Sequence, residues 1–194
     1  MSEYQNTISA EELDSMPYIS FPGHIVVVES RHTMKQAEEV LSKSKVIGFD
    51  TETRPSFAKG VNYKTALLQL STEDVAFLFR LRKFRLSRGI LAIMADKNIL
   101  KIGAAINDDI NGLQKSAGKF IPASFIDLQK EVGKYGIEEL SVKKMSAIVL
   151  GKKVSKAQRL SNWEAKKLTD AQKMYAATDA WVCLKIYNKL QCKQ

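Results

Sequence analysis

The sequence has few of the residues that build the commonest metal and redox sites in proteins. It contains two cysteines, Cys183 and Cys192, and two histidines, His24 and His32. The spacing of the cysteines matches no zinc-binding pattern, and neither histidine has another candidate ligand beside it. Sparse cysteine is typical of proteins that are kept reduced, so we expect an intracellular, cytoplasmic protein.

Long apolar runs are also missing from the sequence. No stretch approaches the roughly 20 apolar residues that a membrane-spanning helix needs. Residues 1–5 lack the basic and apolar regions of a signal peptide. We therefore expect no membrane partner.

Positive charge, in contrast, is abundant. The 194 residues carry 30 Lys and Arg against 21 Asp and Glu, for a net charge of +9, and 45% of the residues are hydrophobic. This size and composition predict a single soluble α/β domain. The charge favours a polyanionic partner, with nucleic acid before a membrane surface or an acidic protein. A generally lysine-rich surface is the alternative.

Against this basic background, residues 46–53 read as a buried strand that ends in acids. Val46, Ile47 and Phe49 have the composition of a strand packed on both faces, and Asp50 and Glu52 follow. Side chains two residues apart on a strand point to the same side, so the two carboxylates lie close together. A pair of hard carboxylate oxygens favours Mg²⁺ or Mn²⁺. A solvated strand end is the alternative at this stage.

The hydrophobic pattern around this strand predicts an alternation of strands and helices. Residues 1–23 are expected to form an N-terminal arm, and residues 24–194 a single domain. Three strands follow one another without a helix between them, which implies antiparallel neighbours. The expected strands cover residues 24–29, 46–53, 65–71, 74–79 and 99–104, and the expected helices cover residues 34–42, 87–95, 107–117, 139–150 and 169–190. Residues 125–129 are expected to form either another short strand or the entry to a helix.

Further acids stand at or within the expected helices. Thr33, Asn107 or Asp108, and Asp127 are expected to cap helices, although Asp127 is also a candidate for the site. Asp108 and Asp109 are adjacent, and capping explains one of them. In the last helix, Tyr175 and Asp179 are four residues apart and lie on the same face. An acid within so apolar a helix needs a partner, which a metal ion would supply.

Two basic loops are candidates for contact with nucleic acid. In residues 54–64, Arg54, Lys59 and Lys64 could meet phosphates and Phe57 could stack on a base. Residues 152–163 are rich in Lys and Arg and end in Trp163. That tryptophan either stacks on a base or packs into the core, and the sequence leaves both open.

Together these motifs resemble the DEDD superfamily of 3′-5′ exonucleases, in the subgroup with tyrosine in the third motif, which includes ribonuclease D and the exonuclease domain of the Werner syndrome protein. Phe49 to Glu52 resembles the first motif, Gly103 to Leu113 the second, and Ser161 to Trp163 with Leu168 to Ala180 the third. In the second motif the family's aspartate is followed four residues later by an apolar residue. Asp109 with Leu113 fits this pattern, whereas Asp108 with Gly112 does not.

The resemblance implies a ribonuclease H-like fold, with a mixed five-stranded central sheet flanked by helices, and here an additional short N-terminal strand. It implies that Asp50, Glu52, Asp109 and Asp179 hold two Mg²⁺ or Mn²⁺ ions and that Tyr175 orients the attacking water. The substrate would be the 3′ end of DNA or RNA, released as nucleoside monophosphates. A non-catalytic nucleic-acid-binding module and a ribonuclease H-type endonuclease are the alternatives. The candidates for substrate contact are Thr51, through its backbone, Arg54, Phe57, Lys64, Asn162 and Trp163.

Overall fold

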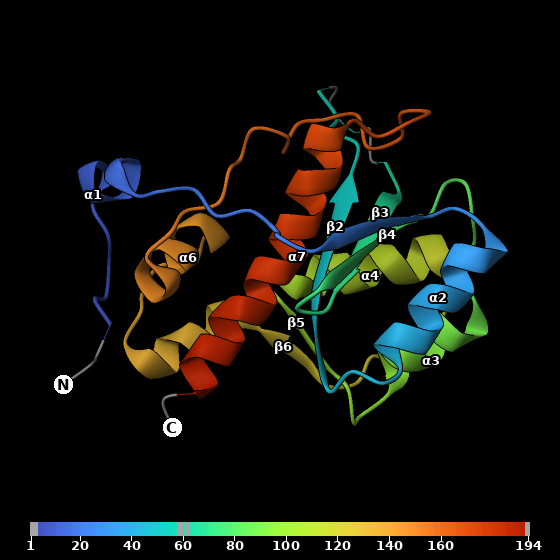
Figure 1. The fold of residues 1–194 in the computed structure, drawn as a ribbon, viewed down its shortest axis with the longest axis horizontal. Coiled ribbons are helices and arrows are strands. Elements are labelled where there is room, and N and C mark those ends of the chain that lie inside the picture. The colour runs from blue at the N-terminus through green and yellow to red at the C-terminus, as the bar shows by residue number, and fades with distance from the viewer. Residues whose placement is uncertain (1–3, 58–59, 61–62, 193–194) are drawn as a thin grey trace.

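A single mixed sheet of six strands forms the centre of the protein, whose computed structural model describes residues 4–57, 60 and 63–192 (Figure 1). The strand order is β1-β4-β3-β2-β5-β6. β2, β3 and β4 pair antiparallel, while β1, β5 and β6 run parallel to β4, β2 and β5 respectively. The predicted fold class is therefore confirmed, and the N-terminal strand extends the sheet beyond β4. The strands are β1 (His24–Val28), β2 (Val46–Thr53), β3 (Thr65–Ser71), β4 (Val75–Arg80), β5 (Leu100–Gly103) and β6 (Phe125–Asp127).

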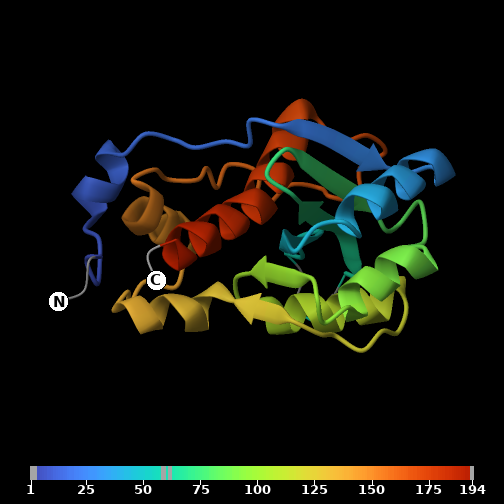
Figure 2. The ribbon, with the colours of Figure 1, turned by 60° about the horizontal axis from the view of Figure 1, so that its bottom comes forward.

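Helices cover both faces of this sheet (Figures 1 and 2). The longest helix, α7, crosses one face, and α2, α3 and α4 cover the other. Within the described ranges, no helix has the length and apolarity needed to cross a membrane. The helices are α1 (Ala10–Ser15), α2 (Arg31–Leu41), α3 (Arg88–Ala95), α4 (Ile106–Ala117), α5 (Leu128–Glu131), the 3₁₀ helix η1 (Val132–Tyr135), α6 (Val142–Leu150) and α7 (Asp170–Gln191).

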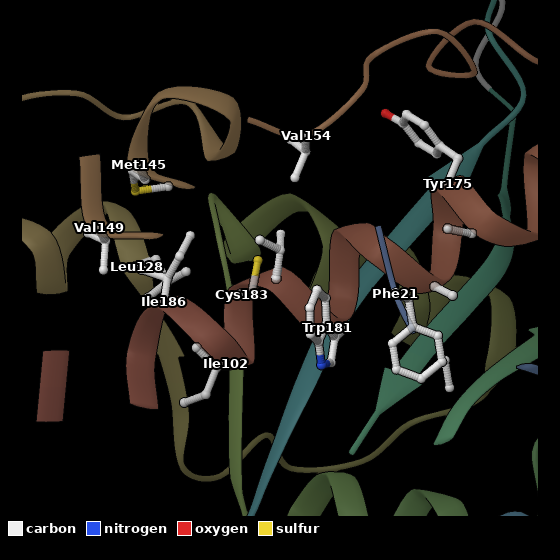
Figure 3. Close-up of a cluster of buried hydrophobic side chains, with 14 of the residues drawn as sticks. Phe21, Ile102, Leu128, Met145, Val149, Val154, Tyr175, Trp181, Cys183 and Ile186 are labelled. Atoms are coloured by element: carbon white, nitrogen blue, oxygen red, sulfur yellow. The ribbon is translucent and has the colours of Figure 1, made fainter. Parts of the chain in front are cut away.

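Each face of the sheet has its own hydrophobic core. On the α7 face, Trp181, Cys183 and Ile186 pack with residues such as Ile102 and Leu128 (Figure 3). On the other face, the apolar sides of α2, α3 and α4 pack against aromatic and aliphatic residues of β2, β3 and β4. Because alternate strand residues enter different cores, β2 presents Phe49 to one face and Asp50 to the other.

The backbone of α7 comes unusually close to β2 at Gly48. A Cβ atom on Gly48 would lie 2.0 Å from the carbonyl oxygen of Ala180. Glycine is therefore required here, because any side chain would push the helix away. This close approach sets Asp179 beside the acidic end of β2.

Several helix boundaries differ from the predictions. Ser30, not Thr33, caps α2, and Thr33 completes its capping box. Helix α4 begins at Ile106, so Asp108 lies inside its first turn, and the capping role predicted for Asn107 or Asp108 is wrong. Asp127 does cap α5, as predicted. These differences of a few residues arise where several candidate caps are adjacent in the sequence.

The N-terminal arm contains a helix that the sequence analysis did not predict. Ser9 caps α1 in a capping box, and Leu13 packs with Ile8 and Ala147. Farther along the arm, Phe21 is buried, and its N–H donates a hydrogen bond to the Thr178 hydroxyl in α7. The arm thus packs along α6 and α7 before it enters the sheet as β1 (Figure 1).

Candidate metal centre and active site

Three carboxylates meet at the carboxyl end of β2. Asp50 and Glu52 come from the strand and Asp179 comes from α7. One oxygen from each carboxylate lies within 4.8 Å of one from each of the other two. Residues separated by more than 120 positions in the sequence therefore form one acidic cluster, as the sequence analysis predicted.

A fourth acid, Asp109, lies on the opposite side of the same strand end. Thr51, which lies between Asp50 and Glu52, donates its hydroxyl to Asp109 Oδ1 at 2.5 Å. This bond ties β2 to the first turn of α4. The charge of Asp109 also raises the pKa of both Asp50 and Glu52, which places it close to the acidic cluster. Asp109 is thus tied to the strand that carries Asp50 and Glu52, but it lies outside the group of three carboxylates whose oxygens are within 4.8 Å of one another.

The turn that leads into α4 is itself held in place by another acid. Ala105 has a left-handed backbone conformation, with φ of 56°, which a residue with a Cβ adopts only at a cost. Its N–H donates to Asp127 Oδ1 at 2.9 Å, and the Gln129 N–H donates to the same oxygen at 3.0 Å. Asp127 thus fixes the turn that sets the position of Asp109 and, consistent with its capping role, contributes no carboxylate to the cluster.

Burial raises the pKa of every acid in the group, and repulsion from the neighbouring site carboxylates adds to the rise for Asp50 and Glu52. Burial, followed by the neighbouring carboxylates, raises the pKa of Asp50 well above its usual value. Burial and Asp179 raise the pKa of Glu52 to about 8. Burial raises the pKa of Asp109 to about 6, although the hydrogen bond from Thr51 opposes the rise. Burial also raises the pKa of Asp179. Without a cation, these acids resist ionisation.

The chemistry of this donor set fits a divalent metal ion. All four groups supply hard oxygen ligands, which Mg²⁺ and Mn²⁺ prefer. Asp179 Oδ1 is also buried and has no hydrogen-bond partner among the described residues. A buried carboxylate oxygen without a donor is costly, and a cation beside it removes that cost. The acidic cluster therefore has the ligands and the uncompensated charge that a metal site requires.

Tyr175 lies one helical turn before Asp179 and is nearly buried. Burial, followed by the charges of Asp179 and the other neighbouring acids, raises the pKa of its hydroxyl. The phenol therefore stays protonated at neutral pH. It is suited to positioning a ligand of the site, and it is unsuited to serve as a base.

Three of the candidates for substrate contact line one cleft of about 480 Å³, which begins beside Arg54, two residues after Glu52. Arg54 lies over the Tyr63 ring and 3.7 Å from Glu164, and Phe57 is 86% exposed. Asn162 also lines the cleft, together with Leu160. Lys64 is exposed but does not line the cleft. Lys59 lies outside the described residues.

The expectation that Trp163 stacks on a base is not met. Its side chain is fully buried, in a tilted contact with the Tyr175 ring at 5.9 Å between centroids. No face of the indole is left for a nucleotide. The packing alternative is the correct one, and Trp163 instead supports Tyr175 from inside the core.

Two cations near the acids were not singled out by the sequence analysis. Lys156 lowers the pKa of both Glu52 and Asp179, and Arg159 lowers that of Glu52, which places both cations within electrostatic range of the cluster. Both are exposed and belong to residues 152–163, here called the basic loop. The cationic run in the sequence indicated a role for the loop, but its spacing did not indicate which cations face the acids.

Comparisons with known proteins agree with this geometry. A family model described as 3′-5′ exonuclease matches residues 25–193. The mouse bifunctional 3′-5′ exonuclease/ATP-dependent helicase WRN is 33% identical over 187 residues, covering 91% of this chain and 13% of that protein. The Aedes aegypti exonuclease mut-7 homolog is 28% identical over 193 residues, covering 87% of this chain and 27% of that protein. The chain therefore spans a small part of the length of these relatives.

Solved structures share the fold. The Aedes aegypti Nibbler EXO domain superposes with a TM-score of 0.78 at 24% identity, covering 88% of each chain. Escherichia coli RNase D, an exoribonuclease, superposes with a TM-score of 0.78 at 23% identity, covering 88% of this chain and 45% of that chain. At these identities the superpositions show the fold alone.

Proposed function

Since this chain belongs to the 3′-5′ exonuclease family, we propose that it shortens DNA or RNA from the 3′ end by hydrolysing the terminal phosphodiester and releasing nucleoside monophosphates. The observation that carries the proposal is the meeting of Asp50, Glu52 and Asp179 at the end of β2, with Tyr175 one helical turn from Asp179 and Asp109 tied to the same strand end through Thr51. They come from β2, α4 and α7, and the packing of an α/β domain does not by itself require so much uncompensated negative charge in one place.

We propose that the four acids bind divalent metal ions. Asp50, Glu52 and Asp179 have the proximity needed to hold one ion, and Asp109, which acts electrostatically on Asp50, would share a second with it. Two bound Mg²⁺ or Mn²⁺ ions would supply a water with a lowered pKa and would stabilise the charge that develops on the leaving oxygen. The acids resist ionisation without a cation. A bound ion would therefore stabilise the ionised carboxylates, and the ionised carboxylates would in turn hold the ion.

The remaining side chains of the site would orient the reactants. The protonated Tyr175 hydroxyl would fix the attacking water, since Tyr175 lies one helical turn from Asp179 and its ring is backed by the buried Trp163. Lys156 and Arg159 lie within electrostatic range of the acids and would offset the charge of the scissile phosphate. They leave the carboxylates free to bind metal because, in the part of the chain that the structure describes, no ion pair joins either cation to a site acid.

The cleft beside Arg54 would bind the last nucleotides of the strand. Phe57 offers an exposed ring for stacking on a base, and Asn162 offers an exposed amide in the same cleft. The protein backbone at Thr51 would contact the terminal nucleotide, and Lys64 would contact the phosphate backbone farther along the nucleic acid. Because the cations bind phosphate, the affinity for substrate should fall as salt rises.

The test is a time course on 5′-labelled single-stranded and 3′-recessed DNA and RNA, with and without Mn²⁺. We expect stepwise shortening from the 3′ end, mononucleotide products, and no reaction without the metal or in Asp50→Ala. A circular single strand, which has no end, should survive. Cleavage of the circle would show an endonuclease instead, and full activity in Asp50→Ala would refute the site assignment. Metal-dependent binding without any turnover would favour the non-catalytic module.

A further inference from the structure

Gln69 is a polar residue at the centre of a strand that is otherwise built for the core. Every residue of β3 is buried, and Gln69 lies between Leu68 and Leu70 with 0% of its surface exposed. Neither the oxygen nor the nitrogen of its side-chain amide has a hydrogen-bond partner among the described residues. A leucine or methionine would fill this position without burying an unpartnered amide.

The strand register places this amide beside the acidic cluster. Gln69 of β3 is paired directly with Asp50 of β2. Residues directly opposite in an antiparallel pair have neighbouring side chains on the same face of the sheet. Gln69 is therefore a cross-strand neighbour of a carboxylate to which we assign metal binding.

The next pair along the same two strands shows which face this is. Gly48 is paired with Ser71, and a Cβ atom on Gly48 would lie 3.1 Å from Ser71 Oγ and 2.0 Å from the Ala180 carbonyl oxygen of α7. Side chains at positions 48 and 71 thus point toward α7. Positions 50 and 69, two residues away on each strand, point the same way. The meeting of Asp50 with Asp179 of α7 agrees.

We propose that Gln69 is a positioning residue of the metal centre, whose unpartnered amide N–H would donate a hydrogen bond to the Asp50 carboxylate when that carboxylate binds an ion, and would hold it in the orientation that binding needs. Carboxylates that ligate metals are themselves hydrogen-bonded by a surrounding layer of side chains. The other neighbours of Gln69 on β3 and β4, Leu68, Leu70 and Leu78, have no side-chain acceptor to offer. This inference rests on the proposed function, because it assumes that the acids bind metal.

A competing role for the amide is structural. The indole nitrogen of Trp181 in α7 is also buried without a partner among the described residues. Pairing of the Gln69 oxygen with that nitrogen would make Gln69 a support for the α7 face of the core. The two roles predict opposite responses when the amide is replaced by an apolar side chain of similar length.

The experiment compares Gln69→Met with wild type in the full chain, using two measurements. The first is the affinity for Mn²⁺ by calorimetry, and the second is the melting temperature of the metal-free protein in chelator. We expect Gln69→Met to bind Mn²⁺ about tenfold more weakly, with a melting temperature that is unchanged or higher. Ser71→Ala is the matched control. It removes another buried, unpartnered polar atom from the same face of β3, and its cross-strand neighbour is Gly48 rather than an acid, so its Mn²⁺ affinity should stay within about twofold of wild type.

A Gln69→Met protein that binds Mn²⁺ as tightly as wild type would overturn the proposal, most clearly if its melting temperature also falls. Repeating the substitution in an Asp50→Asn background adds a second check, because no further loss of affinity is expected there. A loss that persists in that background would show that the amide does not act through Asp50. Should the methionine variant fail to fold, Gln69→Leu replaces it. If wild type itself binds no Mn²⁺, the proposed function fails before the role of Gln69 is reached.

Discussion

The two sides of the end of β2 are built differently, although both carry acids. Toward α7, Asp50, Glu52 and Asp179 crowd together, and Asp179 Oδ1 has no partner among the described residues. Toward α4, Asp109 already accepts a hydrogen bond from Thr51. The pKa of Glu52 rises to about 8, whereas that of Asp109 rises only to about 6.

This contrast indicates how the two sides are stabilised. On the α7 side the chain provides mainly burial and repulsion, so the ionised cluster depends on a bound cation. On the α4 side the chain itself provides a donor that orients the carboxylate. Bound metal should therefore stabilise the α7 side most strongly. On the α4 side, the position of Asp109 should depend on its hydrogen bond from Thr51.

The largest expected effect separates the two adjacent acids of α4. Asp109→Asn should lower kcat/KM by about a thousandfold, because it removes one of the proposed metal ligands. Asp108→Asn, its matched control one position away, should stay within about twofold of wild type, since Asp108 is exposed. The measurement is mononucleotide release at saturating Mn²⁺. The reverse result would assign the second motif to Asp108.

A smaller loss is expected for Tyr175→Phe. In the proposed mechanism the hydroxyl positions the attacking water and binds no metal, so kcat should fall about a hundredfold, the lower end of what a positioned proton-handling group supplies. Mn²⁺ affinity and KM should change little, which single-turnover kinetics and calorimetry would check. A variant that loses Mn²⁺ affinity instead would show that the hydroxyl mainly holds Asp179.

The hydrogen bond on the α4 side is tested by Thr51→Val against Thr51→Ser. Valine has the same shape and lacks the hydroxyl, so we expect about a tenfold loss of Mn²⁺ affinity. Serine keeps the hydroxyl and should restore most of it. Equal behaviour of the two variants would mean that the backbone of Thr51, and not its side chain, is what matters.

The stability of the metal-free protein should fall as pH rises. In the folded protein the pKa values of Asp109 and Glu52 lie above their usual values of 3.8 and 4.5. Their contribution to the stability of the fold is therefore greatest below about pH 4. It is lost as pH rises through about 6 for Asp109 and about 8 for Glu52. We expect a lower melting temperature at pH 8 than at pH 5, and recovery at pH 8 with Mn²⁺. Glu52→Gln should remove part of the fall, and a melting temperature that rises from pH 5 to pH 8 without metal would contradict the pKa shifts.

The sequence predicted the strands and the convergence of the acids because each is marked by local pattern. β2 is an apolar strand that ends in alternate acids, and α7 begins at a capping box formed by Thr169 and Gln172. The order of such elements restricts the possible sheets to a few, and the resemblance to a known family selected one. The capping role of Asp127 was also a matter of local chemistry.

What the sequence did not predict depends on contacts between distant segments. The burial of Trp163 depends on how a loop packs against α7, and the side-chain role of Thr51 depends on the placement of α4. The basic loop gave no sign that Lys156 and Arg159 lie near the acids, because an irregular loop has no period from which to read orientation. Gln69, a polar residue within an apolar strand, was an available signal that passed unnoticed, as was the Ser9–Glu12 capping box of α1.

A calorimetric titration of the metal-free protein with Mn²⁺ at pH 8 measures directly whether the acidic cluster binds metal. We expect saturable binding of two ions by wild type and loss of that binding in Asp179→Asn. Asp170→Asn, which changes an exposed acid in the first turn of the same helix, should bind as wild type does. Equal binding by Asp179→Asn, or no saturable binding by wild type, would contradict the claim that the end of β2 is built around divalent cations.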